Sequence, residues 1–385
     1  MAESSATALV LHGAKDLRVE KRAVSAPSDA DVQVAVQATG LCGSDLHYYS
    51  HGRNGDFVVR EPMFGDRVAL EVGLPCRKCA LCKSGRYNIC KAMQFRSSAK
   101  MFPHLDGTLM ERTNHPADMC HALPSNVSDA GGALVEPLAV CLHAIRRSRP
   151  PSKEEVAAAK TTGEGTSALV FGAGAIGLLL ASSLAAAENF SSILVADIDA
   201  ARLEIAASLG LKTALIPRDP TNPPPAKDAP HADQTAWALT NAQSVAAKLT
   251  EVANAADDAE ITGFSRVYDC TGVPACVQAG IYASSPGGLL VQVGMGNPIQ
   301  TVPVGAAALR EVDVIGTFRY DGHAYPAAIA LLASGKLAAT EEKVVTHRVS
   351  LEDGARAFTL AGKGVDESGR PVVKVIIESK LQASL

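Results

Sequence analysis

Four cysteines with the spacing C-x2-C-x2-C-x7-C are the first candidates for chemistry: Cys76, Cys79, Cys82 and Cys90. Gly73, Pro75 and Gly85 flank them, so the backbone can curl four thiolates around one ion. Four sulfur ligands without a histidine are typical of tetrahedral zinc in a closed, structural site. An iron–sulfur cluster is the rival, because the first three spacings match a ferredoxin run. The x7 gap and a nucleotide-binding pattern downstream favour zinc.

The second candidate is the loop Gly172-Ala173-Gly174-Ala175-Ile176-Gly177, which follows a strand-like stretch and opens a helix-like one. Gly172 permits a tight turn, Gly174 lets the backbone approach a pyrophosphate, and Gly177 lets helix and strand pack closely. The helix then offers unpaired N–H groups to the phosphates. An acid, Asp197, follows twenty residues after Gly177, which completes a dinucleotide-binding pattern.

Asp197 favours NAD over NADP. Its carboxylate can accept hydrogen bonds from both adenosine ribose hydroxyls and would repel a 2′-phosphate. Arg202 is a competing signal, because an arginine near this point can bind that phosphate, but it lies a helical turn further on. The alternative in which the glycines serve only helix packing stays open.

Two kinds of scaffold would position these sites. Strand-like stretches at 8–11, 17–20, 32–39 and 67–72 predict an irregular β domain. A helical spacing of apolar residues from Leu134 to Ile145 then bridges to an α/β part. Strand-like stretches alternate with helices there, at 168–171, 193–197, 266–270, 289–293 and 312–316. This alternation predicts a parallel, doubly wound sheet, and we expect a catalytic domain over 1–150 and 320–385 and a nucleotide-binding domain over 151–319.

Three segments need separate interpretation. Residues 166–187 carry no charge, but a strand, three glycines and an apolar helix describe their order better than a membrane span does. Residues 217–233 hold six prolines and predict an exposed loop of low order. Residues 372–377 are strand-like, and we expect them to return to the first domain's sheet.

The overall composition restricts the class of function. A chain of 385 residues is long enough for two cores. A formal net charge of −4 provides no basic field for nucleic acid or an anionic membrane surface. Nine cysteines, an odd number with four of them clustered, predict reduced thiols and a cytoplasmic location. The acidic N-terminus does not look like a signal peptide.

With these features assembled, the chain resembles the medium-chain zinc dehydrogenases, in the polyol branch of sorbitol, xylitol and L-arabinitol dehydrogenases. The resemblance rests on residues 39–48 (TGLCGSDLHY), the cysteine cluster, 134–140 (LVEPLAV) and 316–320 (GTFRY). It implies a GroES-like catalytic domain beside a Rossmann domain, a polyol substrate, and a homo-oligomer, specifically a tetramer.

The resemblance also implies roles for individual residues. Cys42 would be a ligand of a catalytic zinc, with Glu136 beside it holding its water or the substrate. Ser44, Tyr48, Arg319 and Tyr320 would form the catalytic pocket for the polyol, although packing is the alternative role for either tyrosine. The residues that would hold NAD are Gly172, Gly174, Ile176, Gly177, Asp197, Arg202, Val293, Gly294, Met295, Thr317 and Phe318. Zinc would lower the pKa of the bound alcohol, and hydride transfer would leave a ketose.

The sequence departs from the family pattern at one place. Relatives carry a Gly-His-Glu motif, which includes a histidine ligand of the catalytic zinc, downstream of a segment like 60–63. Here Met63 and Phe64 run directly into Gly65-Asp66-Arg67-Val68, so that roughly twenty residues, about two strands with their turns, are absent.

This gap leaves two hypotheses open. Cys42 and Glu136 supply at most two ligands, whereas a catalytic zinc usually has three protein ligands, and His47 or His51 would have to substitute. The chain is then either an NAD-dependent polyol dehydrogenase or a catalytically impaired NAD-binding protein of the same fold. Because the missing strands would expose edges in the β domain, poor folding is a further expectation.

Overall fold

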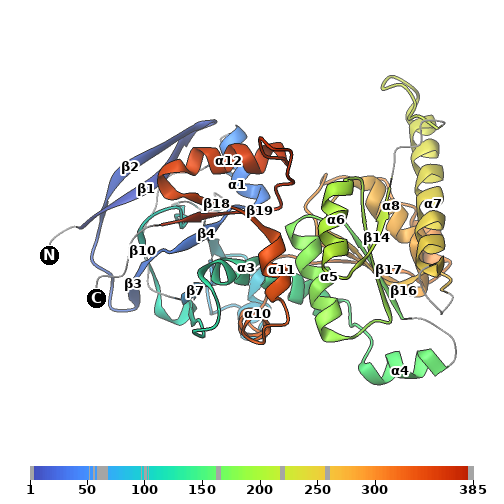
Figure 1. Cartoon of the computed structure of the whole chain (residues 1–385), viewed down its shortest axis with the longest axis horizontal. Coiled ribbons are helices and arrows are strands. Elements are labelled where there is room, and N and C mark those ends of the chain that lie inside the picture. Colours follow the sequence, from blue (N-terminus) through green and yellow to red (C-terminus); the bar gives the residue numbers. More distant parts are fainter. Residues whose placement is uncertain are drawn as a thin grey trace. The chain divides into compact units, whose positions relative to one another are not determined.

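The structure is a computed structural model that describes residues 4–51, 53–54, 57–58, 68–96, 98, 102, 104–161, 166–216, 222–255 and 261–379 (Figure 1). It divides into unit 1 (Met1–Val140, Arg319–Leu385) and unit 2 (Cys141–Phe318). The first division between the units lies inside helix α3 (Asp129–Arg147). Directly after this helix, Ser148 Oγ lies 2.7 Å from Tyr268 Oη, a contact within unit 2.

Unit 2 contains a sheet of six parallel strands in the order β14-β13-β12-β15-β16-β17. The strands are β12 (Ser167–Phe171), β13 (Ser192–Asp197), β14 (Lys212–Leu215), β15 (Phe264–Asp269), β16 (Ser284–Gln292) and β17 (Asp313–Gly316). The strand order reverses between β12 and β15, and doubly wound sheets bind ligands beyond the carboxyl ends of strands at such a point. The predicted doubly wound sheet is confirmed, although β14 was not predicted.

Helices cover both faces of this sheet. Two of them, α5 (Ala175–Ala187) and α6 (Ala200–Ser208), pack on β12, β13 and β14. Figure 1 shows α7 (His231–Ala255) and α8 (Pro274–Ala283) on the opposite side. Two further helices in the described part of the unit are α4 (Lys153–Thr161) and α9 (Val304–Ala308).

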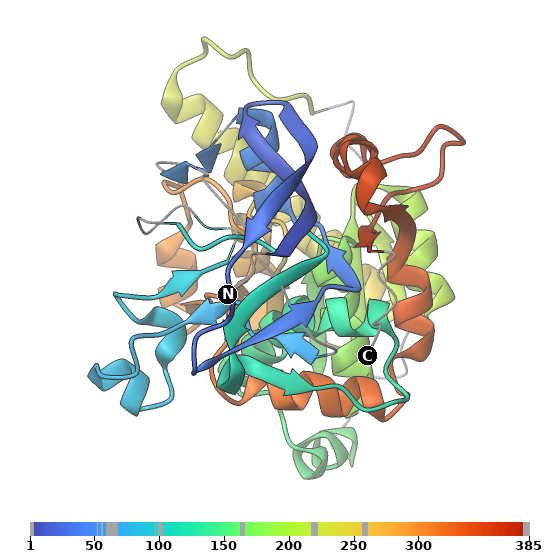
Figure 2. The same ribbon diagram turned by 90° about the vertical axis from the view of Figure 1, so that its left-hand side faces the viewer.

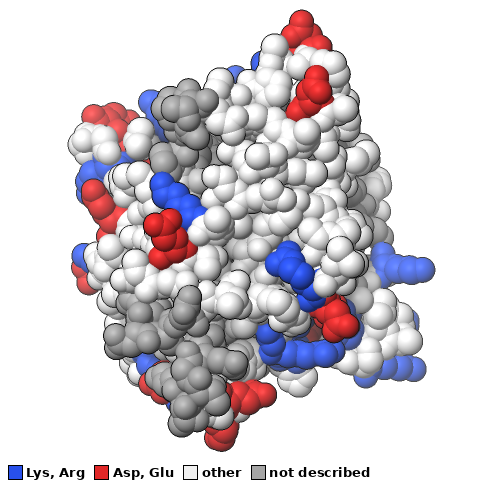
Figure 3. Space-filling view, turned by 90° about the vertical axis from the view of Figure 1, so that its right-hand side faces the viewer, with Lys and Arg blue, Asp and Glu red and all other residues white. Residues whose placement is uncertain are grey.

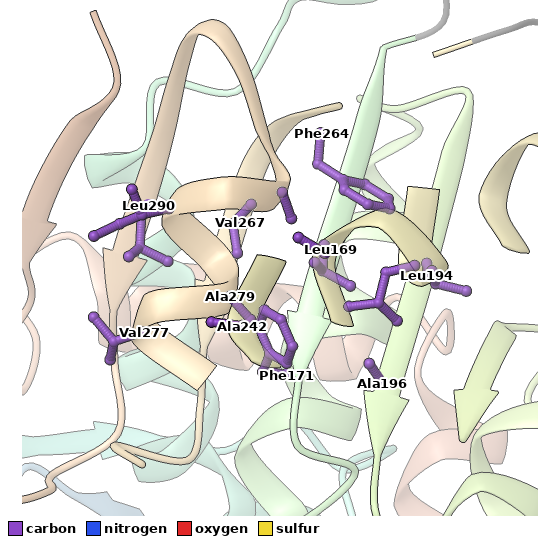
Figure 4. Close-up of a cluster of buried hydrophobic side chains, with 14 of the residues drawn as sticks. Leu169, Phe171, Leu194, Ala196, Ala242, Phe264, Val267, Val277, Ala279 and Leu290 are labelled. Atoms are coloured by element: carbon purple, nitrogen blue, oxygen red, sulfur yellow. The ribbon is translucent and has the colours of Figure 1, made fainter. Parts of the chain in front are cut away.

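The core of unit 2 lies between the sheet and α7 and α8. Figure 4 shows Phe171 of β12 beside Ala242 of α7 and Ala279 of α8. The buried residues of α7 are Ala242, Ala246, Leu249 and Ala253. They follow the helical spacing of one face, and the small side chains of the three alanines let the helix approach the strands closely.

The proline-rich segment is only partly a loop. Residues 222–230 form no helix or strand, but α7 already begins at His231, so the prediction of a loop was wrong for 231–233. Trp237 Nε1 donates a hydrogen bond of 2.9 Å to Asn222 Oδ1, which ties the segment to the helix. Residues 217–221 lie outside the described residues.

Unit 1 is built from small sheets, and its largest described sheet has three strands (Figure 2). The two-stranded sheets pair β1 (Ser4–Gly13) with β2 (Asp16–Val24), β3 (Asp31–Ala35) with β10 (Arg112–Pro116), β5 (Arg53–Asn54) with β6 (Phe57–Val58), β7 (Val68–Leu70) with β11 (Cys120–Ala122), and β8 (Gly73–Leu74) with β9 (Gln94–Phe95). Its helices are α1 (Gly43–His51), α2 (Ala80–Lys83), α10 (Ala324–Ala333), α11 (Ala338–Val344) and α12 (Gly354–Lys363), with 3-10 turns η1 (Tyr87–Ile89), η2 (Ala117–Met119) and η3 (Leu351–Asp353).

The three-stranded sheet joins distant parts of the sequence. Strand β19 (Lys374–Glu378) pairs in parallel with β18 (Val345–Ser350) and antiparallel with β4 (Ala38–Gly40). The C-terminal strand therefore returns to the first domain, as predicted. The predicted strand 32–39 is broken in two, because β3 ends at Ala35 and β4 begins at Ala38. The junction of Met63 and Phe64 lies outside the described residues.

Residues 166–187 form β12, the glycine loop and α5, in the predicted order. In the described part of the chain, no helix has both the length and the apolar character needed to cross a bilayer.

Candidate active site

The glycine loop forms the tight strand-to-helix turn that its spacing predicts. Gly172 has φ +97°, a left-handed backbone conformation that favours glycine. A Cβ on Gly177 would overlap the carbonyl oxygen of Gly172, so the helix can approach the turn only with glycine there. A Cβ on Gly174, by contrast, would meet no atom within 4 Å. Gly174 is the N-cap of α5, and the space beside it leaves room for a ligand at the helix N-terminus.

Asp197 ends β13 beside this loop. Its carboxylate accepts hydrogen bonds from the backbone N–H groups of Ala173, at 2.6 Å, and Asp199, at 2.9 Å. Each carboxylate oxygen can accept a further bond, so the ribose role predicted for Asp197 remains compatible with these contacts. The same contacts fix the loop and the acid relative to each other.

Arg202 lies in the first turn of α6, half-buried. Its Nε is 3.6 Å from Asp199 Oδ2, and Asp199 also caps the helix by accepting hydrogen bonds from the backbone N–H groups of Ala201 and Arg202. The guanidinium is therefore drawn towards a carboxylate. This arrangement weakens the competing argument for NADP.

The remaining predicted cofactor residues follow the ends of β16 and β17. The backbone N–H groups of Val293 and Gly294 both donate to the carbonyl of Asp269, at 2.9 and 2.8 Å. The N–H of Thr317 donates to the carbonyl of Gln292 at 3.2 Å, and Met295 and Phe318 are exposed. Unit 2 thus brings the predicted cofactor residues to the carboxyl end of its sheet, with Ile176 in the first turn of α5.

Asp269, at the end of β15, was missed by the sequence analysis. It is fully buried and accepts hydrogen bonds from Thr271 Oγ1, at 2.6 Å, and from the backbone N–H of Gly272, at 2.9 Å. Burial raises the pKa of its carboxyl, and the bonds from Thr271 and Gly272 oppose that shift. The sequence signal that could have identified Asp269 is an acidic residue at the end of an apolar strand, followed by Cys-Thr-Gly. Asp269 shapes the loop that lies next to Gly172, whose Cβ would sit 2.9 Å from Thr271 Cγ2.

The four clustered cysteines of unit 1 meet as predicted. Their ligand sulfurs all lie within 4.8 Å of one another. The separations between Sγ atoms are 3.8 Å for Cys76 and Cys82, 3.4 Å for Cys79 and Cys82, and 3.9 Å for Cys79 and Cys90. A tetrahedron of zinc–sulfur bonds of about 2.3 Å requires sulfurs about 3.8 Å apart. The donor set and its spacing therefore fit structural zinc.

Cys42 stands immediately before α1 and is exposed. Its backbone N–H donates to Asp45 Oδ2 at 2.8 Å, which closes the first turn of the helix. Burial raises the pKa of the Asp45 carboxyl, whereas the bond from Cys42 and the charge of Lys374 lower it. Tyr48, one turn further on, is buried. The Ser44 side chain lies outside the described part of the chain.

Glu136 lies in α3, half-buried, directly before Pro137. Burial raises the pKa of its carboxyl, and the cations Lys374 and Arg319 oppose that shift. Lys374 is the second residue that the sequence analysis missed. It is buried in β19 and donates a hydrogen bond from Nζ to the carbonyl of Leu41 at 2.7 Å, which fixes the backbone just before Cys42. A lone lysine inside the apolar run 372–377 was the signal.

Arg319 and Tyr320 begin the second segment of unit 1. Burial lowers the pKa of the Arg319 guanidinium, and the charges of Tyr320, Glu136 and Tyr48 raise it. Tyr320 is buried, with its ring centroid 5.0 Å from that of Tyr325. The structure therefore brings four of the predicted pocket residues into one electrostatic neighbourhood.

The catalytic zinc fits less well. In the described ranges, the four cysteines are the only group of three or more histidine, cysteine or acidic side chains that could share an ion. His47 is exposed on α1, and the His51 side chain lies outside the described residues. Cys42 and Glu136 alone do not make a donor set for a catalytic zinc, and we derive no step through such an ion.

Unit 1 also contains a network of buried and half-buried polar side chains. The carboxylate of Glu71 accepts hydrogen bonds from Tyr87 Oη and, at 2.7 Å, pairs with His121 Nε2. The backbone carbonyl of Glu71 lies 3.2 Å from Nε2 of the buried His115, whose Nδ1 accepts from Arg96 Nε at 3.0 Å. These bonds hold β7, β10 and β11 together where the sheets of unit 1 are small.

Comparison with known proteins agrees with this geometry. The alcohol dehydrogenase GroES-like domain matches residues 51–125, and the zinc-binding dehydrogenase family matches residues 175–334. Sorbitol dehydrogenase of Gallus gallus is 36% identical over 384 residues, covering 93% of this chain and 94% of that protein. D-xylulose reductase A of Aspergillus oryzae is 35% identical over 380 residues, covering 92% and 94%.

A solved structure shares the fold as a whole. L-idonate 5-dehydrogenase from Escherichia coli superposes with a TM-score of 0.76 at 22% identity, covering 98% of this chain and 99% of its own. With the two domain matches and relatives that are more than one third identical over nearly the whole length, the chain belongs to the zinc-binding, medium-chain dehydrogenases, in the polyol branch that includes sorbitol dehydrogenase and D-xylulose reductase.

Proposed function

We propose that this protein is an NAD-dependent polyol dehydrogenase that oxidises a secondary alcohol of a sugar alcohol, such as sorbitol, xylitol or L-arabinitol, to a ketose. The observation that carries the proposal is the similarity to polyol dehydrogenases over more than nine-tenths of the chain. In unit 1 the charges of Glu136, Tyr48 and Tyr320 act on the Arg319 guanidinium, and side chains of these types would offer the several hydroxyls of a polyol hydrogen-bond partners. The sorbitol dehydrogenases and D-xylulose reductases that resemble the chain support this substrate class.

Unit 2 would supply the cofactor site. The N–H groups at the start of α5 would bind the pyrophosphate of NAD, and Asp197 would accept hydrogen bonds from the adenosine ribose. NAD, when bound, accepts the hydride that leaves the carbinol carbon. The oxidation would also release the proton of the alcohol, so that each turnover would form one ketose, one NADH and one proton.

A second candidate function is favoured by the incomplete donor set around Cys42 and Glu136. In that case the chain would be a catalytically impaired NAD-binding protein of the same fold, and its zinc would occupy only the cysteine site. Both candidates predict NAD binding, so binding alone does not separate them.

Zinc counting and turnover together distinguish the two candidates. Purified, metal-replete protein is offered a panel of polyols with NAD, and NADH formation is followed by absorbance while zinc is measured by elemental analysis. The dehydrogenase proposal expects NADH from at least one polyol. No turnover across the panel, together with one zinc per chain, would overturn it in favour of the second candidate.

The oligomeric state is part of the proposal. We expect a homo-oligomer, and the resemblance to the family specifies a tetramer. Pairing of at least two copies is supported by β17, an edge strand of the described sheet, and by exposed apolar side chains near it, among them Val304, Leu309 and Val314. The side of unit 2 seen in Figure 3 also has a broad area without charged side chains. An exposed strand edge can pair with the same edge of a second copy about a two-fold axis. Analytical ultracentrifugation tests this, and a monomer at micromolar concentration would contradict it.

A further inference from the structure

Arg319 has a backbone conformation that needs support. Its φ is +52°, in the left-handed region where residues other than glycine are strained. Such conformations persist when the surrounding contacts determine them. Arg319 is half-buried, and the contacts that hold its side chain therefore decide where the guanidinium is presented.

One side chain that contacts Arg319 comes from the cysteine lobe, which we define as residues 73–95. The guanidinium carbon lies 3.6 Å from the centroid of the Phe95 ring, within the range of a cation–π contact. The ring also packs against Gly73, on which a Cβ would lie 3.3 Å from Phe95 Cδ2. Gly73 and Phe95 are paired residues of β8 and β9.

The pairing of β8 with β9 closes the base of the lobe. Strand β8 ends two residues before Cys76, and β9 begins four residues after Cys90. The ligands of the cysteine site and the two strands therefore belong to one short closed loop of chain. The β8–β9 pairing and the bond of the adjacent Arg96 to His115 hold the base of this loop, and an ion bound by the cysteines would hold the rest of it.

A second contact of the lobe supports the same segment. Tyr87, in η1, lies against Gly322, where a Cβ would be 3.1 Å from Tyr87 Cε1. The Tyr87 hydroxyl donates to the buried Glu71, which anchors the ring. The lobe thus contacts the chain at Arg319 and again three residues later.

We propose that the cysteine lobe, held together by its zinc, positions Arg319 for the polyol through the ring of Phe95. Phe95 is then a positioning residue, and the structural zinc acts on substrate binding although it is remote from the reacting atoms. This inference rests on the proposed function in one respect, namely that Arg319 binds polyol hydroxyls. The coupling between the lobe and Arg319 is independent of that role.

The first test separates substrate binding from turnover. Phe95→Leu keeps an apolar side chain but removes the ring, Phe95→Tyr keeps the ring, and Phe102→Leu changes an exposed phenylalanine elsewhere in unit 1. We expect Phe95→Leu to raise KM for the polyol by roughly two- to thirtyfold, the range of a cation–π contact. The KM for NAD should stay constant, and Phe95→Tyr should restore the polyol KM. An unchanged polyol KM in Phe95→Leu would overturn the proposal.

The second test needs no enzymatic activity. Arg319 is modified with phenylglyoxal, and the rate is followed by mass spectrometry of the peptide that contains it. We expect faster modification in Phe95→Leu, and also in the unaltered protein after a chelator has removed the zinc, but not in Phe95→Tyr or Phe102→Leu.

Together, the two tests distinguish a failure of the proposed function from a failure of the proposed coupling between the cysteine lobe and Arg319. If no polyol is oxidised but the reactivity of Arg319 follows Phe95 and zinc, the proposed function is wrong and the coupling holds. If polyols are oxidised but neither change alters the reactivity of Arg319, the coupling is wrong. Zinc content shows whether Phe95→Leu retains a loaded lobe, and even a variant that loses zinc must expose Arg319 if the proposal is right.

Discussion

Lys374 shows at the scale of a single residue how the pocket of unit 1 is held. Its ammonium group is buried and donates to the carbonyl of Leu41, next to the exposed Cys42. Gly40 makes this possible, because a Cβ there would lie 2.7 Å from Lys374 Cε. Buried polar groups that lose their partner cost the full desolvation penalty. The lysine therefore stabilises both the backbone at Leu41 and the carboxylates of Glu136 and Asp45.

Replacing Lys374 with methionine is expected to lower the free energy of unfolding by about 1 to 3 kcal/mol, the cost of a buried carbonyl left without its donor. Lys363→Met, on the exposed surface of α12, is the matched control. Urea unfolding of the two variants measures the difference. Equal stability of the two variants would show that the Leu41 carbonyl finds another donor.

Some site residues could be predicted from residue type and spacing, and others could not. The cysteine cluster and the glycine loop were predictable, because ligand chemistry and turn geometry act within a few neighbouring residues. Lys374 and Asp269 were missed, since their partners, Leu41 and Thr271, are defined by the fold or by a turn that no periodicity reports. The role of Phe95 depends on a contact across more than two hundred residues of sequence, which spacing cannot show.

At the scale of elements, the unit formed by β12, the glycine loop and α5 separates two functions of glycine. Gly177 lies inside the packing of helix on turn, whereas Gly174 faces open space at the helix N-terminus. One glycine therefore serves the fold and the other is expected to serve the cofactor. A pair of alanine substitutions can separate these roles.

Gly177→Ala is expected to destabilise unit 2 by about 1 to 3 kcal/mol, because the new methyl group overlaps the carbonyl of Gly172. Gly174→Ala is expected to change stability by less than about 0.5 kcal/mol. It should nevertheless weaken NADH binding by about tenfold or more, since a contact worth about 1.4 kcal/mol is that factor. Fluorescence titration with NADH and urea unfolding give both quantities. Normal NADH affinity in a stable Gly174→Ala protein would contradict the proposal that the pyrophosphate binds beside Gly174.

Helices and strands were predicted best in the part of the chain where strands alternate with helices. In unit 2 the buried strands and their connecting helices repeat a pattern, so the sheet was predicted except for the short edge strand β14 (Lys212–Leu215). Only Ala214 of that strand is buried. In unit 1 the strands are short and pair across long separations, such as β3 with β10. Their register is set by tertiary contacts, and the break at 36–37 was therefore not visible in the sequence.

At the scale of the whole molecule, the two units bury different kinds of side chain. The core of unit 2 is a continuous apolar cluster between sheet and helices. Unit 1, with its small sheets, depends in addition on the buried bonds among Arg96, His115 and Glu71. Acid should therefore affect unit 1 before it affects the core of unit 2.

The sign of this pH dependence follows from His115. Burial, and next to it the charge of Arg96, lowers its pKa to about 4, whereas in the unfolded chain the pKa of histidine is about 6.5. Between these values the unfolded chain binds more protons than the folded protein, so the free energy of unfolding falls as the pH is lowered through this interval. The two pKa values differ by an amount that corresponds to about 3 kcal/mol.

His115→Gln tests this dependence, because an amide can accept from Arg96 and donate to the Glu71 carbonyl without titrating. Protonation of carboxylates in acid also lowers the free energy of unfolding, but these groups are common to both proteins. The difference between the two unfolding free energies therefore isolates His115. Urea unfolding at several pH values between about 4 and about 7 should show the unaltered protein losing about 3 kcal/mol more than the variant. Parallel pH curves would mean that the folded protein accommodates a proton on His115, and that its bonds with Arg96 and Glu71 are not what ties the sheets of unit 1 together.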